Sequence, residues 1–235
     1  MAEVGNGFAP LVAQARRVRA HAIRMATNGG CFLGASLSCA DLLVFLYDRV
    51  LRVSPSRCSD PDRDYLFLSK GHDVPALYGT LAERGFFPLA RLSNHLAIED
   101  DLYWHPNRAV PGVEFHSGSL GHLLSVGMGV AVDVKLRRGP SRVFVIVGDG
   151  ELDEGSNWEA VQYAGRIGLG RLTAVVIDNH SSRYHWPGGV DARFALEGWS
   201  TTRCDGRDHD AIEDAFDAAT GERPHVVAAD VERKR

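Results

Sequence analysis

Residues 143–151 read Val-Phe-Val-Ile-Val-Gly-Asp-Gly-Glu, an apolar run followed by two glycines that flank an aspartate. The run predicts a buried strand over 142–147, and a second apolar run predicts another strand over 172–177. A helix is expected between them, over 155–167. Apolar strands that alternate with helices are typical of a parallel sheet covered on both faces. The expected fold class is therefore α/β, with a doubly wound, mostly parallel sheet flanked by helices.

The rest of the chain continues this alternation. Apolar runs and helical periodicity predict further strands at 64–69 and 225–230, and further helices at 8–28, 40–51, 74–84, 88–95, 119–137 and 209–220. Ser38 is a candidate N-cap for the helix that follows it. The chain has 235 residues, a length that suits one large domain. We therefore expect a single domain over 1–235.

The helix predicted over 119–137 contains several glycines, which are unfavourable inside helices. Gly121, Ser125 and Gly129 are spaced four residues apart and would share one helix face. Two interpretations remain open at this point. Either the helix is kinked or shorter than predicted, or another backbone or a ligand approaches this face closely.

Composition excludes several classes of protein. Hydrophobic residues make up 45% of the chain and the formal net charge is −4, which excludes an intrinsically disordered chain and argues against a nucleic-acid partner. No apolar run reaches the length of about 18 residues that a membrane span needs. The first ten residues lack a secretory signal pattern. We expect a cytoplasmic protein with neither nucleic-acid nor membrane partners.

The segment around Asp149 carries the chemistry. Gly148 and Gly150 would let the backbone approach a phosphate, and the following helix would offer free N–H groups to it. A carboxylate and a phosphate share a site only with a cation, and Mg²⁺ takes both kinds of oxygen. Asn179 follows the next predicted strand, 30 residues beyond Asp149. The sequence therefore predicts a diphosphate held through Mg²⁺ between Asp149 and Asn179.

Residues 148–179 as a whole, GDGELDEGSNWEAVQYAGRIGLGRLTAVVIDN, resemble the thiamine-diphosphate motif of transketolases. The resemblance continues in SKGHDVPALYGTLAERGFFP at 69–88 and in HPNRAVPGVEFHSGSLGHLLSVGMGVA at 105–131. It covers residues 20–230 approximately. Transketolases have three domains, and this sequence matches only the first. The chain thus looks like the N-terminal, diphosphate-binding subunit of a split transketolase.

The resemblance implies roles for particular residues. Asp149 and Asn179 match the side chains that bind the metal, and the backbone carbonyl of Ser181 matches a third ligand. The implied cofactor-binding residues are His72, Gly118, Ser119, Leu120, Gly148, Asp149, Gly150, Glu151 and Asn179. Of these, Gly150 and Glu151 match the turn beside the diphosphate, and Gly118, Ser119 and Leu120 match a loop against the cofactor rings.

Three further residues match catalytic positions of the family. His72 matches a histidine that contacts cofactor and substrate, and His105 matches one near the hydroxyls of the donor. Glu154 matches a glutamate at the subunit interface, near the network that activates the cofactor. Each also has a purely structural interpretation: the histidines as loop residues, and Glu154 as an acid favoured at a helix start.

The resemblance also implies an activity and a partner. A transketolase transfers a two-carbon ketol unit from a ketose donor to an aldehyde acceptor, so the substrates would be small sugars. The family's activating glutamate belongs to the pyrimidine-binding domain, for which this sequence has no counterpart. A C-terminal transketolase subunit would supply it, and a heterotetramer of two plus two chains is expected.

The sequence departs from the family in four places. The family's S-G-H-P-G histidine is missing, since Phe32 or Cys31 stands at its position. His122 and Leu123 replace a Gln-Gly pair, the loop at 179–188 is bulkier and more aromatic, and the T-x-K-G-x-G segment is absent after the last predicted strand. These changes concern the donor or acceptor more than the cofactor. They favour a non-standard acceptor, in specialised metabolism, over an ordinary pentose-phosphate role.

Alternative functions stay open on the sequence alone. A deoxyxylulose-phosphate synthase or an oxo-acid dehydrogenase subunit would share the GDG…N pattern, but not the SKGH and GSLG segments. A non-catalytic scaffold subunit would explain the missing histidine, although the pair Asp149 and Asn179 opposes it. A dinucleotide-binding domain would need a G-x-G-x-x-G turn, which is absent after the strand at 142–147.

Overall fold

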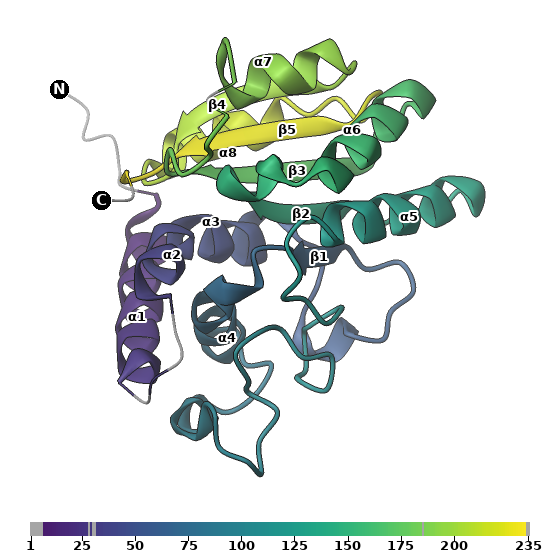
Figure 1. Ribbon diagram of the computed structural model, residues 1–235. Coiled ribbons are helices and arrows are strands. Elements are labelled where there is room, and N and C mark those ends of the chain that lie inside the picture. Colours follow the sequence, from purple (N-terminus) through teal and green to yellow (C-terminus); the bar gives the residue numbers. More distant parts are fainter. Residues whose placement is uncertain (1–6, 28, 30–31, 185, 234–235) are drawn as a thin grey trace, which may run out of the picture.

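The central element is a parallel sheet of five strands. In this computed structural model, which describes residues 7–27, 29, 32–184 and 186–233, the strand order is β1-β2-β3-β5-β4 (Figure 1). All neighbouring strands are parallel. The strands are β1 (Tyr65–Leu68), β2 (Val143–Gly148), β3 (Leu172–Asp178), β4 (Ser200–Asp205) and β5 (His225–Asp230). This arrangement confirms the predicted fold class.

Helices cover both faces of the sheet. One face packs against α5 (Leu123–Leu136), α6 (Gly155–Ile167) and α7 (Gly189–Leu196) (Figure 1). The other face packs against α1 (Ala9–Ala26), α3 (Ala40–Phe45), α4 (Val74–Glu83) and α8 (His209–Asp217). Successive strand residues point to opposite faces. In β2, for example, Val145 and Val147 belong to the first core, whereas Phe144 and Ile146 belong to the second.

Shorter elements complete the chain. They are α2 (Leu33–Ser38), the π-helical turn η1 (Leu46–Val50), and the 3-10 turns η2 (Pro55–Arg57), η3 (Gly71–Asp73), η4 (Leu89–Asn94) and η5 (Gly150–Asp153). The helix predicted at 88–95 is thus a 3-10 segment. Strand β4 and helices α2 and α7 were not predicted. Residue 28, the last of the first predicted helix, lies outside the described residues.

Local sequence explains several helix ends. Pro10 stands in the first turn of α1, where its missing N–H costs nothing, and Gly168 ends α6 with a left-handed φ of 61°. The Asp208 side chain caps α8 by accepting from the N–H groups of Asp210 and Ala211. The predicted cap at Ser38 is wrong: Ser38 ends α2, and its hydroxyl donates to the Ala35 carbonyl at 2.7 Å.

The glycine-rich helix is shorter than predicted. It begins at Leu123, because Gly121 has a φ of 86°, in the left-handed region that interrupts a right-handed helix. Gly121 therefore belongs to a loop. A Cβ on Gly129 would meet open space, so no described neighbour explains that glycine. A Cβ on Gly127 would lie 2.5 Å from the Val145 side chain, so the close approach to the sheet occurs there instead.

Candidate cofactor site

The carboxyl ends of the parallel strands meet at one edge of the sheet, and the larger cavities open there. One cavity of about 1120 Å³ lies over the ends of β1, β2 and β3. Eight of the predicted site residues line it: His72, Leu120, Gly148, Asp149, Gly150, Glu151, Asn179 and Ser181. This is the position at which open α/β sheets bind ligands.

Asp149 is the most highly connected side chain of the site. Its carboxylate is 2% exposed and accepts from the N–H of Ser181 at 2.5 Å, the Ser181 hydroxyl at 2.9 Å and the N–H of Ser182 at 2.8 Å. The N–H of Asn179 adds a longer bond of 3.4 Å. A cation at Asp149 would replace one of these donors. The Ser181 hydroxyl, on a rotatable side chain, is the one that can turn away.

Asn179 provides the test of whether a metal fits. Its side-chain oxygen Oδ1 is buried and has no hydrogen-bond partner among the described residues. A buried acceptor without a donor is unfavourable, so the atom suits a group that arrives with a ligand. Amide and carboxylate oxygens are the donors that Mg²⁺ prefers. Asp149, Asn179 and the carbonyl of Ser181 therefore fit the metal that the family resemblance implies.

A buried lysine stands beside this pair. The Lys70 side chain is almost fully buried, and its ammonium lies 3.1 Å from the Asp73 carboxylate. Burial alone would lower the pKa of Lys70, but the charge of Asp73 raises it above the ordinary value. Lys70 therefore remains a cation next to Gly148. No role was predicted for this lysine from its place in the SKGH segment.

Glu151 is buried at the centre of the site, although it follows the turn at the end of β2. Its carboxyl group accepts from the Ser69 hydroxyl at 2.5 Å, from the N–H of Gly121 at 2.9 Å and from the N–H of Gly148 at 3.3 Å. Burial raises the pKa of this carboxyl group above its ordinary value. All three donors belong to the protein.

The two predicted histidines lie around a glycine-rich contact. A Cβ on Gly71 would lie 3.0 Å from the His105 ring and 3.1 Å from the N of Gly118, and a Cβ on Gly118 would lie 3.0 Å from the same ring. The close approach of these loops therefore requires both glycines. His72 lines the cavity, whereas His105 packs beside it. Burial lowers the pKa of His105, which favours its neutral form.

The remaining predicted residues lie on the outer rim. Gly118, Ser119 and Leu120 are exposed, and of these Leu120 lines the cavity. Glu154 is exposed as well, at the N-terminal cap of α6, and its side chain packs against Gly121. The structure therefore places Glu154 at the surface beside the site, where another chain would reach it.

Phe32 is one of the two residues considered for the position of the family's missing histidine. Its ring is 63% exposed, lines the cavity and lies edge-on to the His72 ring at 5.2 Å between centroids. Cys31, the other residue considered for this position, lies outside the described residues. The wall near His72 thus presents an apolar ring to the cavity.

A second group of acidic residues at the strand ends surrounds an arginine. The guanidinium of Arg203 lies within 3.2 Å of carboxylate oxygens of Asp178, Asp191 and Asp230. His180 adds its ring near Asp178. Because an arginine fills the centre of this group, the strand-end acids there differ from Asp149, which has no arginine partner among the described residues.

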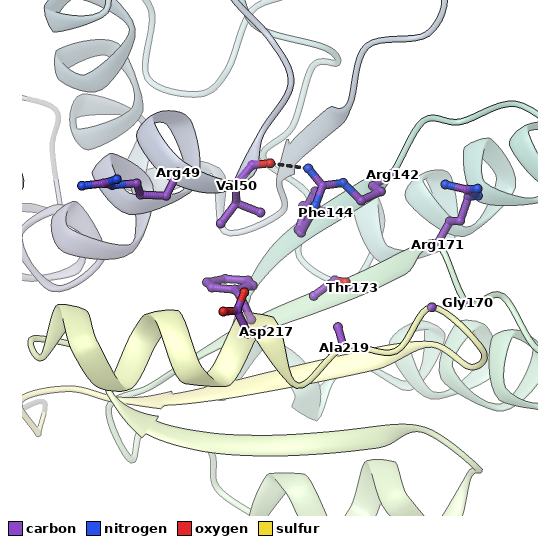
Figure 2. Close-up of a pocket in the computed structure, with 11 residues that line it drawn as sticks. Arg49, Val50, Arg142, Phe144, Gly170, Arg171, Thr173, Asp217 and Ala219 are labelled. Carbon is purple, nitrogen blue, oxygen red and sulfur yellow. Dashed lines mark hydrogen bonds between the residues drawn. The ribbon is translucent and has the colours of Figure 1, made fainter.

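A smaller cavity lies at the opposite edge of the sheet (Figure 2). Arg142 donates there to the Val50 carbonyl and to the buried Asp64. Burial alone would raise the pKa of Asp64, but hydrogen bonds from Arg52 and Arg142 hold it below its ordinary value. These groups satisfy one another at the amino-terminal ends of the strands. No predicted site residue lines this cavity.

Comparison with known proteins identifies the family of this chain. The family described as "Transketolase, thiamine diphosphate binding domain" matches residues 9–231. The chain therefore belongs to this family, in agreement with the resemblance found in the sequence.

Several curated relatives are single subunits. The chain is 33% identical to one subunit of the apulose-4-phosphate transketolase of Actinobacillus succinogenes, over 92% of this chain and 82% of the relative. It is 34% identical to the 6-deoxy-6-sulfo-D-fructose transketolase subunit SqwG of a Clostridium strain, over 80% and 70%. It is 43% identical to a protein named Ferredoxin fas2 of Rhodococcoides fascians, over 85% of this chain and 66% of that protein.

Solved transketolases share the fold. The enzyme of Campylobacter jejuni superposes with a TM-score of 0.87 at 26% identity, over 94% of this chain but 37% of the solved one. The chain therefore corresponds to the thiamine-diphosphate-binding domain of a transketolase and spans little more than a third of the solved enzyme. Among the residues that the structure describes, no helix combines the length and apolarity needed to cross a membrane.

Proposed function

We propose that this chain binds thiamine diphosphate through Mg²⁺ and, with a partner subunit, transfers a two-carbon ketol unit from a ketose to an aldehyde. The observation that carries the proposal is the unpartnered Oδ1 of Asn179 beside the buried Asp149, at the ligand-binding edge of the sheet. We also propose that residues 1–235 act as one domain of this kind.

Each part of the site would have a distinct task. Asp149, Asn179 and the Ser181 carbonyl would hold the metal, and Gly148 and Gly150 would let the diphosphate approach the backbone. A Cβ on Gly150 would lie 2.8 Å from the Ser181 hydroxyl, so the turn has no room for a side chain. When bound, thiamine diphosphate supplies the thiazolium carbon to which the two-carbon unit attaches.

The histidines would act on the substrate. His72 lines the cavity, so its ring can donate to or accept from a sugar hydroxyl. His105 lies against the Gly118 loop, and its lowered pKa keeps it neutral near pH 7, with one nitrogen free to accept a proton. Phe32 offers no hydrogen bond at the neighbouring wall, which supports a non-standard acceptor in specialised metabolism.

The rim of the site supports a requirement for a partner. Leu120, which lines the cavity, is 39% exposed, and Glu154 is exposed at the cap of α6, where its side chain packs against Gly121. A C-terminal subunit with the pyrimidine-binding domain would cover this rim and complete the site. Two copies of each chain would then form a heterotetramer.

Calorimetric titration of thiamine diphosphate with Mg²⁺ tests the proposal. It is run on this chain alone, on the presumed C-terminal partner alone and on their mixture. We expect tight binding in the mixture, followed by ketol transfer between screened ketoses and aldehydes. Absence of binding in the mixture would favour a scaffold subunit. Release of CO₂ from pyruvate would instead indicate another thiamine-diphosphate enzyme.

A further inference from the structure

We propose that Glu151 is a positioning residue, whose buried carboxyl group ties the exposed loop 118–120 to the ends of β1 and β2. The carboxyl accepts from Ser69 after β1, from Gly148 in β2 and from Gly121 directly after the loop. This inference rests on the proposed function, because the loop would lie against the cofactor rings. It differs from the sequence-based expectation, in which Glu151 lies beside the diphosphate as a cofactor contact.

The carboxyl group faces the protein. Glu151 is 3% exposed, and Oε1 accepts two of the three hydrogen bonds while Oε2 accepts the third. A carboxylate turned toward a diphosphate would repel it. In the observed direction, the same group satisfies two buried backbone N–H groups instead.

The backbone of Glu151 is fixed as firmly as its side chain. Its carbonyl accepts from the side-chain N–H of Asn157 at 2.7 Å and from the N–H of Glu154 at 3.0 Å. Asn157 is fully buried in α6. The carboxyl group therefore projects from a turn that is itself held by hydrogen bonds, and it can define where the exposed loop lies.

Gly121 is the point at which the loop is held. Its N–H donates to Glu151, and its carbonyl accepts from the Ser156 hydroxyl at 2.9 Å. Gly121 itself is buried, whereas residues 118–120 are exposed. The loop is thus anchored at its C-terminal end by the turn that also carries Asp149. This one turn therefore positions both Asp149, which would hold the metal, and loop 118–120, which would lie against the cofactor rings.

Two substitutions separate the hydrogen bonds. Glu151→Gln keeps an oxygen that can accept from Ser69 and Gly121, but turns an NH₂ group toward the N–H of Gly148. Glu151→Ala removes both acceptor oxygens and with them all three hydrogen bonds. Asp64→Asn is the matched control, because Asp64 is an equally buried acid that joins loops at the other edge of the sheet, away from the cavity.

The first readout needs no cofactor. Amide hydrogen exchange is followed in the peptide that contains residues 117–123, in the full cofactor-free chain. We expect Glu151→Ala to speed exchange of the Gly121 N–H by at least ~10-fold beyond any global loss of stability, with Glu151→Gln between it and wild type. In Asp64→Asn, amide exchange in this peptide should change only as much as the global stability of the variant predicts.

The second readout uses the chain with its partner. We expect Glu151→Ala to raise the KM for thiamine diphosphate by ~10-fold or more while kcat changes less than about threefold. Glu151→Gln should recover most of the loss. If Glu151→Ala does not fold, both readouts are measured on Glu151→Gln.

Two results would overturn the inference. In the first, the Glu151 variants show the same amide exchange and the same KM for thiamine diphosphate as Asp64→Asn. In the second, kcat of the Glu151 variants falls while their KM for thiamine diphosphate is unchanged. Absence of activity in the mixture of the wild-type chain and its partner would refute the proposed function. The exchange result would still decide whether Glu151 holds the loop.

Discussion

The side-chain oxygen of Asn179 has no partner among the described residues, although the N–H of the same residue donates to the Asp149 carboxylate at 3.4 Å. The two residues directly follow neighbouring strands, β2 and β3, whose register pairs Gly148 with Ile177. Their closeness follows directly from this pairing. Their polar atoms therefore converge at one point of the sheet edge, and one acceptor there remains free for a ligand.

Replacing Asp149 by asparagine should abolish Mg²⁺-dependent cofactor binding. The variant keeps the size of the side chain and an acceptor for the Ser181 loop, but removes the charge that a cation needs. Loss of a supporting residue around a metal typically costs ~10–100-fold in affinity, so removing the charge of a ligand should cost at least ~100-fold. Calorimetry on the mixture with the partner measures this change.

The control for this experiment is Asp230→Asn. Asp230 also ends a strand, but it pairs with Arg203 and lines neither of the two cavities to which Asp149 contributes. We expect its cofactor affinity to remain within about threefold of wild type. Equal affinities for Asp149→Asn and wild type would remove Asp149 from the proposed site.

Replacing His105 or His72 by glutamine should slow ketol transfer and leave cofactor affinity largely intact. Asp149 and Asn179 are unchanged in both variants, so the metal end of the site is preserved. Positioned acid–base groups contribute ~10²–10⁴-fold to rate, and we expect kcat to fall by about 100-fold in each variant. Steady-state kinetics with saturating cofactor measures it. Full activity in either variant would assign that histidine a structural role.

Two glycine substitutions should act in opposite directions on stability. Gly121→Ala forces a side chain onto a φ of 86° and within 2.6 Å of the Ser156 hydroxyl, so we expect a loss of at least ~1 kcal/mol. Gly129→Ala meets open space inside α5, so we expect a gain of up to ~1 kcal/mol. Urea unfolding of the isolated chain compares the two.

The same Gly129→Ala variant also tests the outer face of α5. If it is more stable alone but associates more weakly with the partner or with a second copy, another chain packs closely on that face. A destabilised Gly129→Ala chain would contradict the open space around this residue.

Acid should destabilise the protein through His225. This side chain is 2% exposed; its Nε2 lies 3.1 Å from the Ala215 carbonyl and its Nδ1 lies 2.9 Å from the Ser200 hydroxyl, a pattern that suits the neutral ring. Burial lowers the pKa of His225 below its ordinary value. As pH falls through about 6.5, the unfolded chain therefore takes up a proton before the folded one does, and stability decreases.

Urea unfolding at several pH values between about 7.5 and 5 tests this expectation. His225→Gln should show a smaller loss of stability on acidification than wild type. Raised pKa values at Glu114 and Glu151 act with the opposite sign above about pH 4.5, but they are common to both proteins and cancel in the comparison. Parallel curves for the two proteins would refute the assignment.

The sequence predicted the parts of the fold that are buried and regular. Strands β2 and β3 are buried throughout and each contains an apolar run, so both were evident in the sequence, and their length placed Asn179 one crossover beyond Asp149. Strand β4 was missed because it is an edge strand: five of the six residues in Ser200–Asp205 are at least partly exposed, so the apolar signal is weak.

The candidate site was predicted less completely. Periodicity could not show that the helix at α5 starts after Gly121, since a positive φ leaves no apolar pattern. It also could not show that Lys70 is buried against Asp73 or that Glu151 faces Ser69, because the position of a buried side chain depends on how the strand ends and loops are brought together. Such partners become visible only in the folded chain.

The strand order has a consequence for synthesis of the chain. Strand β5 is the last of the five to be translated, yet it lies between β3 and β4, and β4 forms its ladder with β5 from Ser200 opposite His225 to Asp205 opposite Asp230. On the ribosome, a nascent chain that has not yet reached residue 225 can pair only strands β1, β2 and β3 of the sheet. The apolar edge of β3 is then unpaired, which is a condition that favours aggregation. Emergence of β5 from the ribosome is therefore the step that pairs the free edge of β3 and reduces self-association of the nascent chain.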